Sequence, residues 1–320
     1  MEDRSFLDRV LNYAPGAADL SPRTMRDILR PYVNPWNRPF LKYYDETVEL
    51  LKRLFQTRNS TIVMIGSIRT GLDACVAGLV EPGDKVLVLS NGFWSNYPVE
   101  LVSTYAGIPI VLEEEWGLPI DLEKVREKLE EDPDIKVVIA THVETSTAIA
   151  NPIQEIGRIV KEKGLLYIVD AAQSLGGMEV NVDRWGADLC YSGTHKCMSA
   201  LAGLAFVTVS DEAWEHMRKR REPIRSWYTN LLLWKEQWLE RKRSYHTFPA
   251  TPLHGLRSTL DWIFQESPQK IFERYEVCAR AIRTALKAMG LDLVPNCSRC
   301  EGCDSPNKFC CDTVVAARYP

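Results

Sequence analysis

Short apolar runs alternate with amphipathic stretches along much of the chain, and this alternation is the feature that most limits the possible folds. The runs predicted to form strands are 61–66, 85–90, 108–114, 135–142, 165–170 and 187–193. The stretches predicted to form helices are 45–56, 70–80, 98–107, 122–132 and 153–164. Such an order predicts an α/β fold, with a mostly parallel central sheet sandwiched by helices.

Several residues suited to ligand binding follow these predicted strands at the point where each strand ends. They are Ser67, Trp94, Thr145, Asp170 and Lys196. Ligands of such sheets gather outside the carboxyl ends of the strands, so we expect these residues to converge there. Ser67 stands where a strand gives way to a helix, and its hydroxyl and the first N–H groups of that helix could receive a phosphate. A helix cap explains Ser67 equally well.

Asp170 and Lys196 are predicted to place opposite charges at neighbouring strand ends. A structural ion pair is one interpretation, because a buried charge is costly unless it is paired. The other interpretation is a pyridoxal phosphate site. The lysine amine would form a Schiff base with the cofactor's aldehyde, and the carboxylate would keep the pyridine nitrogen protonated. Trp94 would then stack on the ring, although a single tryptophan is more often a core residue.

Both charged residues lie in the segment IVDAAQSLGGMEVNVDRWGADLCYSGTHKCMSALAGLAFV, residues 168–207. This segment resembles the corresponding block of the class V, fold-type I pyridoxal-phosphate enzymes. Within that class the chain is similar to the alanine–glyoxylate and serine–pyruvate aminotransferase group. Further segments that carry the resemblance are EPGDKVLVLSNGFW, THVETSTAIANPI and SYHTFPATPLHGLR.

The resemblance assigns a role to each matching residue. Lys196 matches the Schiff-base lysine, Asp170 the partner of the pyridinium nitrogen, and Trp94 the stacking aromatic residue. Thr145 matches the hydroxyl near the ring's 3-oxygen, and Thr247 matches a threonine that reaches the phosphate from the neighbouring subunit, so a homodimer is implied. The other residues that the resemblance places at the cofactor are Ser67, Ile68, Arg69, Ala172, Gln173 and His195.

The implied reaction transfers an amino group from alanine or serine to glyoxylate or pyruvate, through the lysine as both covalent tether and general base. Two departures leave other functions open. GSIRTG puts Arg69 where the family has a small residue or histidine, and this arginine could bind phosphate, bind substrate or face solvent. Gln173 and His195 are closer to the cysteine desulfurase branch. A carbon–sulfur lyase and a non-catalytic protein that keeps the fold therefore stay as alternatives.

The end of the chain departs further from the family pattern. We expect a large cofactor-binding domain over residues 1–266 and the start of a small α/β domain over 267–320, with a helix at 268–289. The resemblance implies that this small domain is truncated before its substrate-binding arginine.

Five of the nine cysteines are clustered in the insertion 297–311. Cys297, Cys300, Cys303 and Cys310 could give four thiolates to a structural zinc or an iron–sulfur cluster, but free thiols or adventitious disulfides explain the cluster equally well. The scattered cysteines, Cys75, Cys190, Cys197 and Cys278, are expected to be small buried apolar residues.

Composition narrows the possible partners. A net charge of -4 and a pI near 5.9 give no general attraction for a polyanion, which argues against a nucleic acid. No apolar run is long enough to cross a bilayer, and the first residues contain no secretory signal pattern. We therefore expect a cytoplasmic enzyme whose partners are small amino acids, 2-oxo acids and a second copy of itself.

Overall fold

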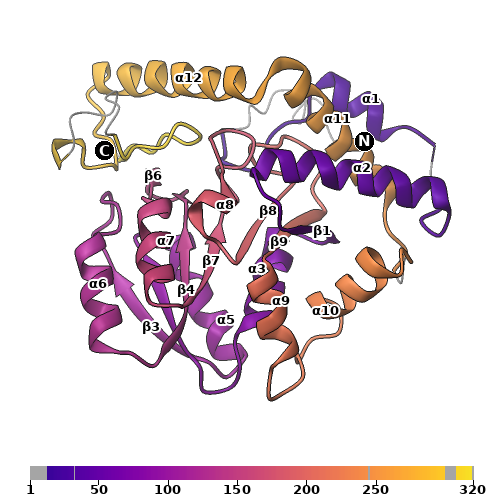
Figure 1. The fold of residues 1–320 in the computed structure, drawn as a ribbon. Helices are drawn as coiled ribbons and strands as arrows, with labels where there is room; N and C mark the ends of the chain where they lie inside the picture. The colour runs from indigo at the N-terminus through magenta and orange to yellow at the C-terminus, as the bar shows by residue number, and fades with distance from the viewer. Residues whose placement is uncertain (1–12, 32, 244–245, 300–307, 319–320) are drawn as a thin grey trace, which may run out of the picture.

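The computed structural model describes residues 13–31, 33–243, 246–299 and 308–318, and its centre is a twisted sheet (Figure 1). The strands of this sheet, in spatial order, are β1 (Ser60–Ile65), β9 (Leu204–Val209), β8 (Leu189–Gly193), β7 (Leu166–Asp170), β4 (Ile135–Thr141), β2 (Lys85–Ser90) and β3 (Ile108–Glu113). All the strands of this sheet run in one direction except β9, which is antiparallel to both β1 and β8. The predicted mostly parallel α/β sheet is therefore confirmed, and all the predicted strands are present.

Helices cover both faces of the sheet, as the alternation predicts (Figure 1). One face carries α3 (Ile68–Leu79), α5 (Pro98–Thr104) and α9 (Asp211–Arg218); the other carries α6 (Leu122–Glu131), α7 (Ile153–Glu162) and α8 (Val182–Trp185). The remaining helices are α1 (Pro22–Ile28), α2 (Arg38–Phe55), α4 (Phe93–Asn96), α10 (Leu231–Trp234), the π-helix η2 (Lys235–Glu240), α11 (Ala250–Glu266), α12 (Pro268–Ala288) and the 3-10 turn η3 (Cys297–Arg299).

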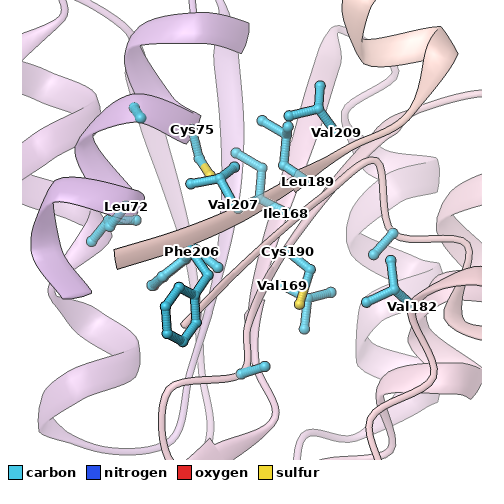
Figure 2. Close-up of a cluster of buried hydrophobic side chains, with 14 of the residues drawn as sticks. Leu72, Cys75, Ile168, Val169, Val182, Leu189, Cys190, Phe206, Val207 and Val209 are labelled. Atoms are coloured by element: carbon cyan, nitrogen blue, oxygen red, sulfur yellow. The ribbon is translucent and has the colours of Figure 1, made fainter. Parts of the chain in front are cut away.

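The core between α3 and the sheet is apolar and closely packed (Figure 2). Leu72 and Cys75 of α3 face strand residues such as Ile168 and Val207, and all of these side chains are buried. Each buried aliphatic side chain contributes about 1.5–3 kcal/mol relative to an exposed one. The predicted burial of Cys75 is confirmed, whereas the prediction for Cys278 is wrong, because that residue lies on an exposed position of α12.

The C-terminal part of the chain packs against the rest of the molecule through α12. Arg283 is buried in α12 and donates a hydrogen bond to the carbonyl oxygen of Cys311 at 3.1 Å. Cys311 also packs with Val143 and Ala148 of a two-stranded hairpin formed by β5 (Val143–Glu144) and β6 (Ile149–Ala150). The helix expected at 268–289 is present, but the described residues after it form isolated bridges instead of a small-domain sheet.

Candidate active site

A cavity of about 450 Å³ opens at the carboxyl ends of the parallel strands, where the sequence predicts a ligand. Its lining includes nearly all the predicted site residues and a part of the N-terminal segment. The lining residues are Gly16, Ala17, Ser67, Ile68, Arg69, Leu72, Trp94, Tyr97, Thr141, Val143, Thr145, Asp170, Ala172, Tyr191, His195 and Lys196. Of the residues predicted to bind the cofactor, Gln173 and Thr247 are not part of this lining.

Asp170 ends β7 at the floor of the cavity, and both of its carboxylate oxygens are held. Oδ1 accepts a hydrogen bond from the backbone N–H of Ala172 at 2.7 Å, and Oδ2 accepts one from the hydroxyl of Tyr191 at 2.8 Å. Burial raises the pKa of Asp170 to about 6, against the lowering effect of these two hydrogen bonds. The carboxylate is thus fixed in orientation, and it is costly to keep ionised unless a cation sits beside it.

Lys196 lies in the loop that follows β8 and projects into the same cavity. Its Nζ lies 5.8 Å from the ring centroid of Trp94 and 3.4 Å from the carbonyl oxygen of Pro15. Burial lowers the pKa of Lys196, which increases the share of neutral, nucleophilic amine. No direct ion pair with Asp170 is formed in the part of the chain that the structure describes, so the simple structural ion pair is not supported.

The turn between β1 and α3 provides hydrogen-bond donors at another wall of the cavity. Gly66 adopts a φ of 138°, which a residue with a side chain rarely adopts, and this lets the strand turn directly into the helix. Ser67 is the N-cap of α3, yet its side chain makes no capping hydrogen bond. The Ser67 hydroxyl and the first N–H groups of α3 are therefore oriented for an anion in the cavity.

Arg69 follows in the first turn of α3 and stays exposed at the mouth of the cavity. Its guanidinium carbon lies 4.1 Å from the ring centroid of Tyr97 and 5.6 Å from that of Trp94. Stacking on an aromatic ring restrains the guanidinium while leaving its N–H groups available. Arg69 is thus a cation at the entrance that can meet an anionic ligand.

Trp94 and Thr145 face the cavity from segments that lie side by side. Trp94 lies in α4, directly after β2, and Thr145 lies between β5 and β6. The Thr145 hydroxyl donates a hydrogen bond to Oε1 of Gln173 at 3.4 Å. Gln173 is buried and is not part of the cavity lining, but it contacts the lining residue Thr145.

His195 lines the cavity beside Lys196, and burial together with the lysine charge lowers its pKa, so its ring is neutral at physiological pH. Thr247 is exposed and lies outside the cavity lining, and its contact with a neighbouring subunit stays a prediction. Cys300 and Cys303 lie outside the described residues. Cys297 and Cys310 are close, with their Sγ atoms 3.2 Å apart. The described residues contain no group of three or more potential metal ligands, so the predicted zinc gains no support.

Sequence reasoning missed Gly16, Tyr191 and Glu144. Tyr191 is the register partner of Asp170 on the neighbouring strand, which places both side chains on one face of the sheet. Gly16 lies against Lys196, and a Cβ added to Gly16 would come within 2.5 Å of the lysine Cδ. Tyr191 could have been predicted, because it lies in the strand expected next to that of Asp170 and has a hydroxyl. Nothing in the sequence around Gly16 indicates its contact with Lys196.

The lining has the chemistry that pyridoxal phosphate requires: an amine, a buried carboxylate, an aromatic face and unused donors at a helix start. Trp94 is 37% exposed although it is a large apolar residue, so it is available to a ring in the cavity and is not a core tryptophan. The residues present therefore fit this cofactor.

Comparisons with known proteins agree with this geometry. The family model described as Aminotransferase class-V matches residues 35–300. An uncharacterized aminotransferase of Methanocaldococcus jannaschii is 34% identical over 306 residues, which cover 96% of this chain and 77% of the relative.

Two solved structures are similar over nearly the whole chain. The ureidoglycine–glyoxylate aminotransferase of Bacillus subtilis has a TM-score of 0.88 at 31% identity, covering 98% of this chain and 79% of that one. The pyridoxamine–pyruvate aminotransferase of Mesorhizobium loti has a TM-score of 0.89 at 27% identity, covering 97% and 77%.

Proposed function

This chain belongs to the class-V aminotransferases, pyridoxal-phosphate-dependent enzymes, and on that premise we propose that it transfers an amino group from alanine or serine to glyoxylate or pyruvate. The acceptors are supported by relatives whose names specify glyoxylate or pyruvate. The single observation that carries the proposal is the convergence of Lys196, Asp170 and Trp94 on one cavity at the sheet edge.

When bound, pyridoxal phosphate supplies an aldehyde that captures amines and a ring that accepts electrons. Lys196 would hold that aldehyde through Nζ. The same Nζ, when it is a free amine, would take up the proton of the donor's α-carbon and hold it for return. Asp170 would hold a proton on the ring nitrogen, and a pKa of about 6 leaves it mostly ionised at neutral pH for this purpose. Trp94 would fix the plane of the ring by stacking.

The other residues would bind the substituents of the ring. Ser67, the backbone of Ile68 and Arg69, and His195 would hold the phosphate. The Thr145 hydroxyl donates its one proton to Gln173 in the structure, and it would turn that proton to the 3-oxygen of the bound ring. The Ala172 N–H would keep Asp170 in place, as it does in the structure.

We also propose a homodimer in which Thr247, exposed on one subunit, reaches the phosphate site of the other. Arg69 would meet the carboxylate of the substrate when it does not bind phosphate. Location in the cytoplasm and the domain division near residue 267 stay predictions. The described residues contain no helix long and apolar enough to span a membrane.

The test identifies the lysine that binds the cofactor by mass spectrometry. Cofactor-free protein is mixed with pyridoxal phosphate, reduced with borohydride and digested, and we expect the mass of the reduced cofactor on the peptide that contains Lys196. The variant Lys196→Arg keeps the positive charge but cannot be labelled, and it serves as the control. A label on another lysine, or none on the wild type, would refute the proposed site.

The same preparation separates the alternative functions. Alanine should bleach the visible absorbance of the loaded wild type, and glyoxylate should restore it. Release of sulfide from cysteine would instead indicate a carbon–sulfur lyase. A loaded protein whose spectrum responds to neither amino acid would be a non-catalytic relative.

A further inference from the structure

Glu144 is a completely buried carboxylate beside the cavity, and the proposed mechanism does not use it. It ends β5, immediately before Thr145. One oxygen, Oε2, accepts a hydrogen bond from the backbone N–H of Ser95 at 2.6 Å. The other, Oε1, accepts from the backbone N–H of Ser146 at 2.8 Å, from the Ser146 hydroxyl at 2.7 Å, and from the Trp94 N–H at 3.4 Å.

Within the described residues, Glu144 shares with Asp170 the property of a buried carboxylate that forms no ion pair, but Asp170 has an assigned role at the cofactor and Glu144 has none. The buried carboxylates of Asp84 and Asp188 are neutralised by lysines, Lys136 and Lys161, each at 2.8 Å. No Lys, Arg or His of the described chain forms an ion pair with Glu144. Burying an unpaired carboxylate is expensive, and here only N–H and O–H donors offset the cost.

Those donors belong to two separate segments. The N–H groups of Trp94 and Ser95 belong to the turn after β2, whereas Ser146 belongs to the hairpin that contains Thr145. A further bond, from the Phe93 N–H to the Ser146 hydroxyl at 3.0 Å, joins the same segments. Gly92 allows this approach, because a Cβ at that position would lie 2.5 Å from the Cδ of Glu144.

We propose that Glu144 is a positioning residue that fixes Trp94 relative to Thr145, and so sets the spacing between the stacking face and the hydroxyl that hold the cofactor ring. This inference rests on the proposed function, because Trp94 and Thr145 are the ring contacts assigned there. A short turn is otherwise free to shift along the sheet edge. Four donors on one fixed carboxylate remove that freedom before any ligand arrives, which lowers the ordering cost of binding.

The test is Glu144→Gln, which keeps the volume but replaces one accepting oxygen with an NH₂ group that faces an N–H donor. Leaving a buried donor unsatisfied weakens the hold on the turn that contains Trp94, so we expect the dissociation constant for pyridoxal phosphate to rise about tenfold. In the cofactor-free protein, the amides of residues 93–96 should exchange hydrogen faster. The visible circular dichroism of the loaded variant should fall, because the ring is held less rigidly.

The matched control is Asp84→Asn, which alters a buried carboxylate that also accepts a backbone N–H, that of Glu81, at the opposite end of β2. We expect this control to lose stability without a change in cofactor affinity or in exchange at 93–96. Ser146→Ala, a smaller change that removes one donor, should give an intermediate loss of affinity and keeps the test valid if Glu144→Gln does not fold.

The inference would be overturned if Glu144→Gln and Ser146→Ala both folded and both showed the cofactor affinity, amide exchange and circular dichroism of the wild type. Failure of the wild type to take up pyridoxal phosphate would instead overturn the proposed function. The two failures are therefore distinguishable.

Discussion

Replacing Asp170 by asparagine should remove a pH-dependent cost from the stability of the cofactor-free protein. The pKa of Asp170 is raised from 3.8 to about 6 in the folded chain, chiefly by burial. A group with a raised folded pKa binds its proton more tightly in the folded state. Its stabilising contribution is therefore present below pH 3.8 and is lost as the pH rises through about 6. Asp170→Asn cannot titrate and should not show this loss.

The magnitude follows from the shift. About two pKa units correspond to about 3 kcal/mol once the carboxylate is fully ionised, and roughly 2 kcal/mol of this develops between about pH 4 and about pH 7. Asparagine can keep the bonds to Ala172 and Tyr191, so the pH-independent difference between the proteins should be small.

The assay is urea unfolding of both cofactor-free proteins across this pH range. The free energy of unfolding of Asp170→Asn minus that of the wild type should rise with pH by about 2 kcal/mol. Tyr191→Phe removes a hydrogen bond that lowers the pKa of Asp170, so its own stability should fall more steeply with pH than that of the wild type. A difference between Asp170→Asn and wild type that does not change with pH would refute the reasoning.

Three further changes test other parts of the structure. Lys196→Arg should abolish amino transfer while leaving the far-ultraviolet circular dichroism unchanged; measurable turnover by the purified variant would contradict the assigned role. Gly157→Ala should lower the free energy of unfolding by about 1–3 kcal/mol, since a Cβ there would overlap the carbonyl oxygen of Trp185; a denaturation curve like that of the wild type would disprove this. Gly16→Ala should weaken cofactor binding, measured by titration, because its Cβ would displace the chain from Lys196; unaltered affinity would show that the segment is not fixed there.

The predicted strands and the convergence of the site residues were accessible from the sequence, because fully buried parallel strands have a simple apolar signature and their ends share one edge. The strand β9 was not predicted, although it is equally apolar. The connection between β8 and β9 covers only residues 194–203, which is too short for a helical crossover and so requires an antiparallel strand. The direction of β9 could thus have been predicted from the length of the loop before it, but not from its hydrophobicity.

The parts of the site that the sequence did not reveal depend on tertiary approach. Glu144 and Ser95 are 49 positions apart, and nothing local indicates that they form a bond. Tyr191 faces Asp170 only because β7 and β8 pair in one register. The start of α3 differs by two residues: the helix was expected from residue 70 but begins at Ile68, which places Arg69 in its first turn. Ser67 stands at the N-cap, a position that the sequence had suggested.

The edge position of β1 has a consequence for how the chain is made. Its one neighbour in the described sheet is β9, so residues 66–203 must leave the ribosome before β1 can acquire a partner. Nascent chains that end before Val209 should therefore keep this apolar strand unpaired and available to chaperones. The turn after β1, which contains Ser67, and the loop after β8, which contains Lys196, are held side by side by β9. These two parts of the binding site should therefore come together only when β9 has been synthesised and paired.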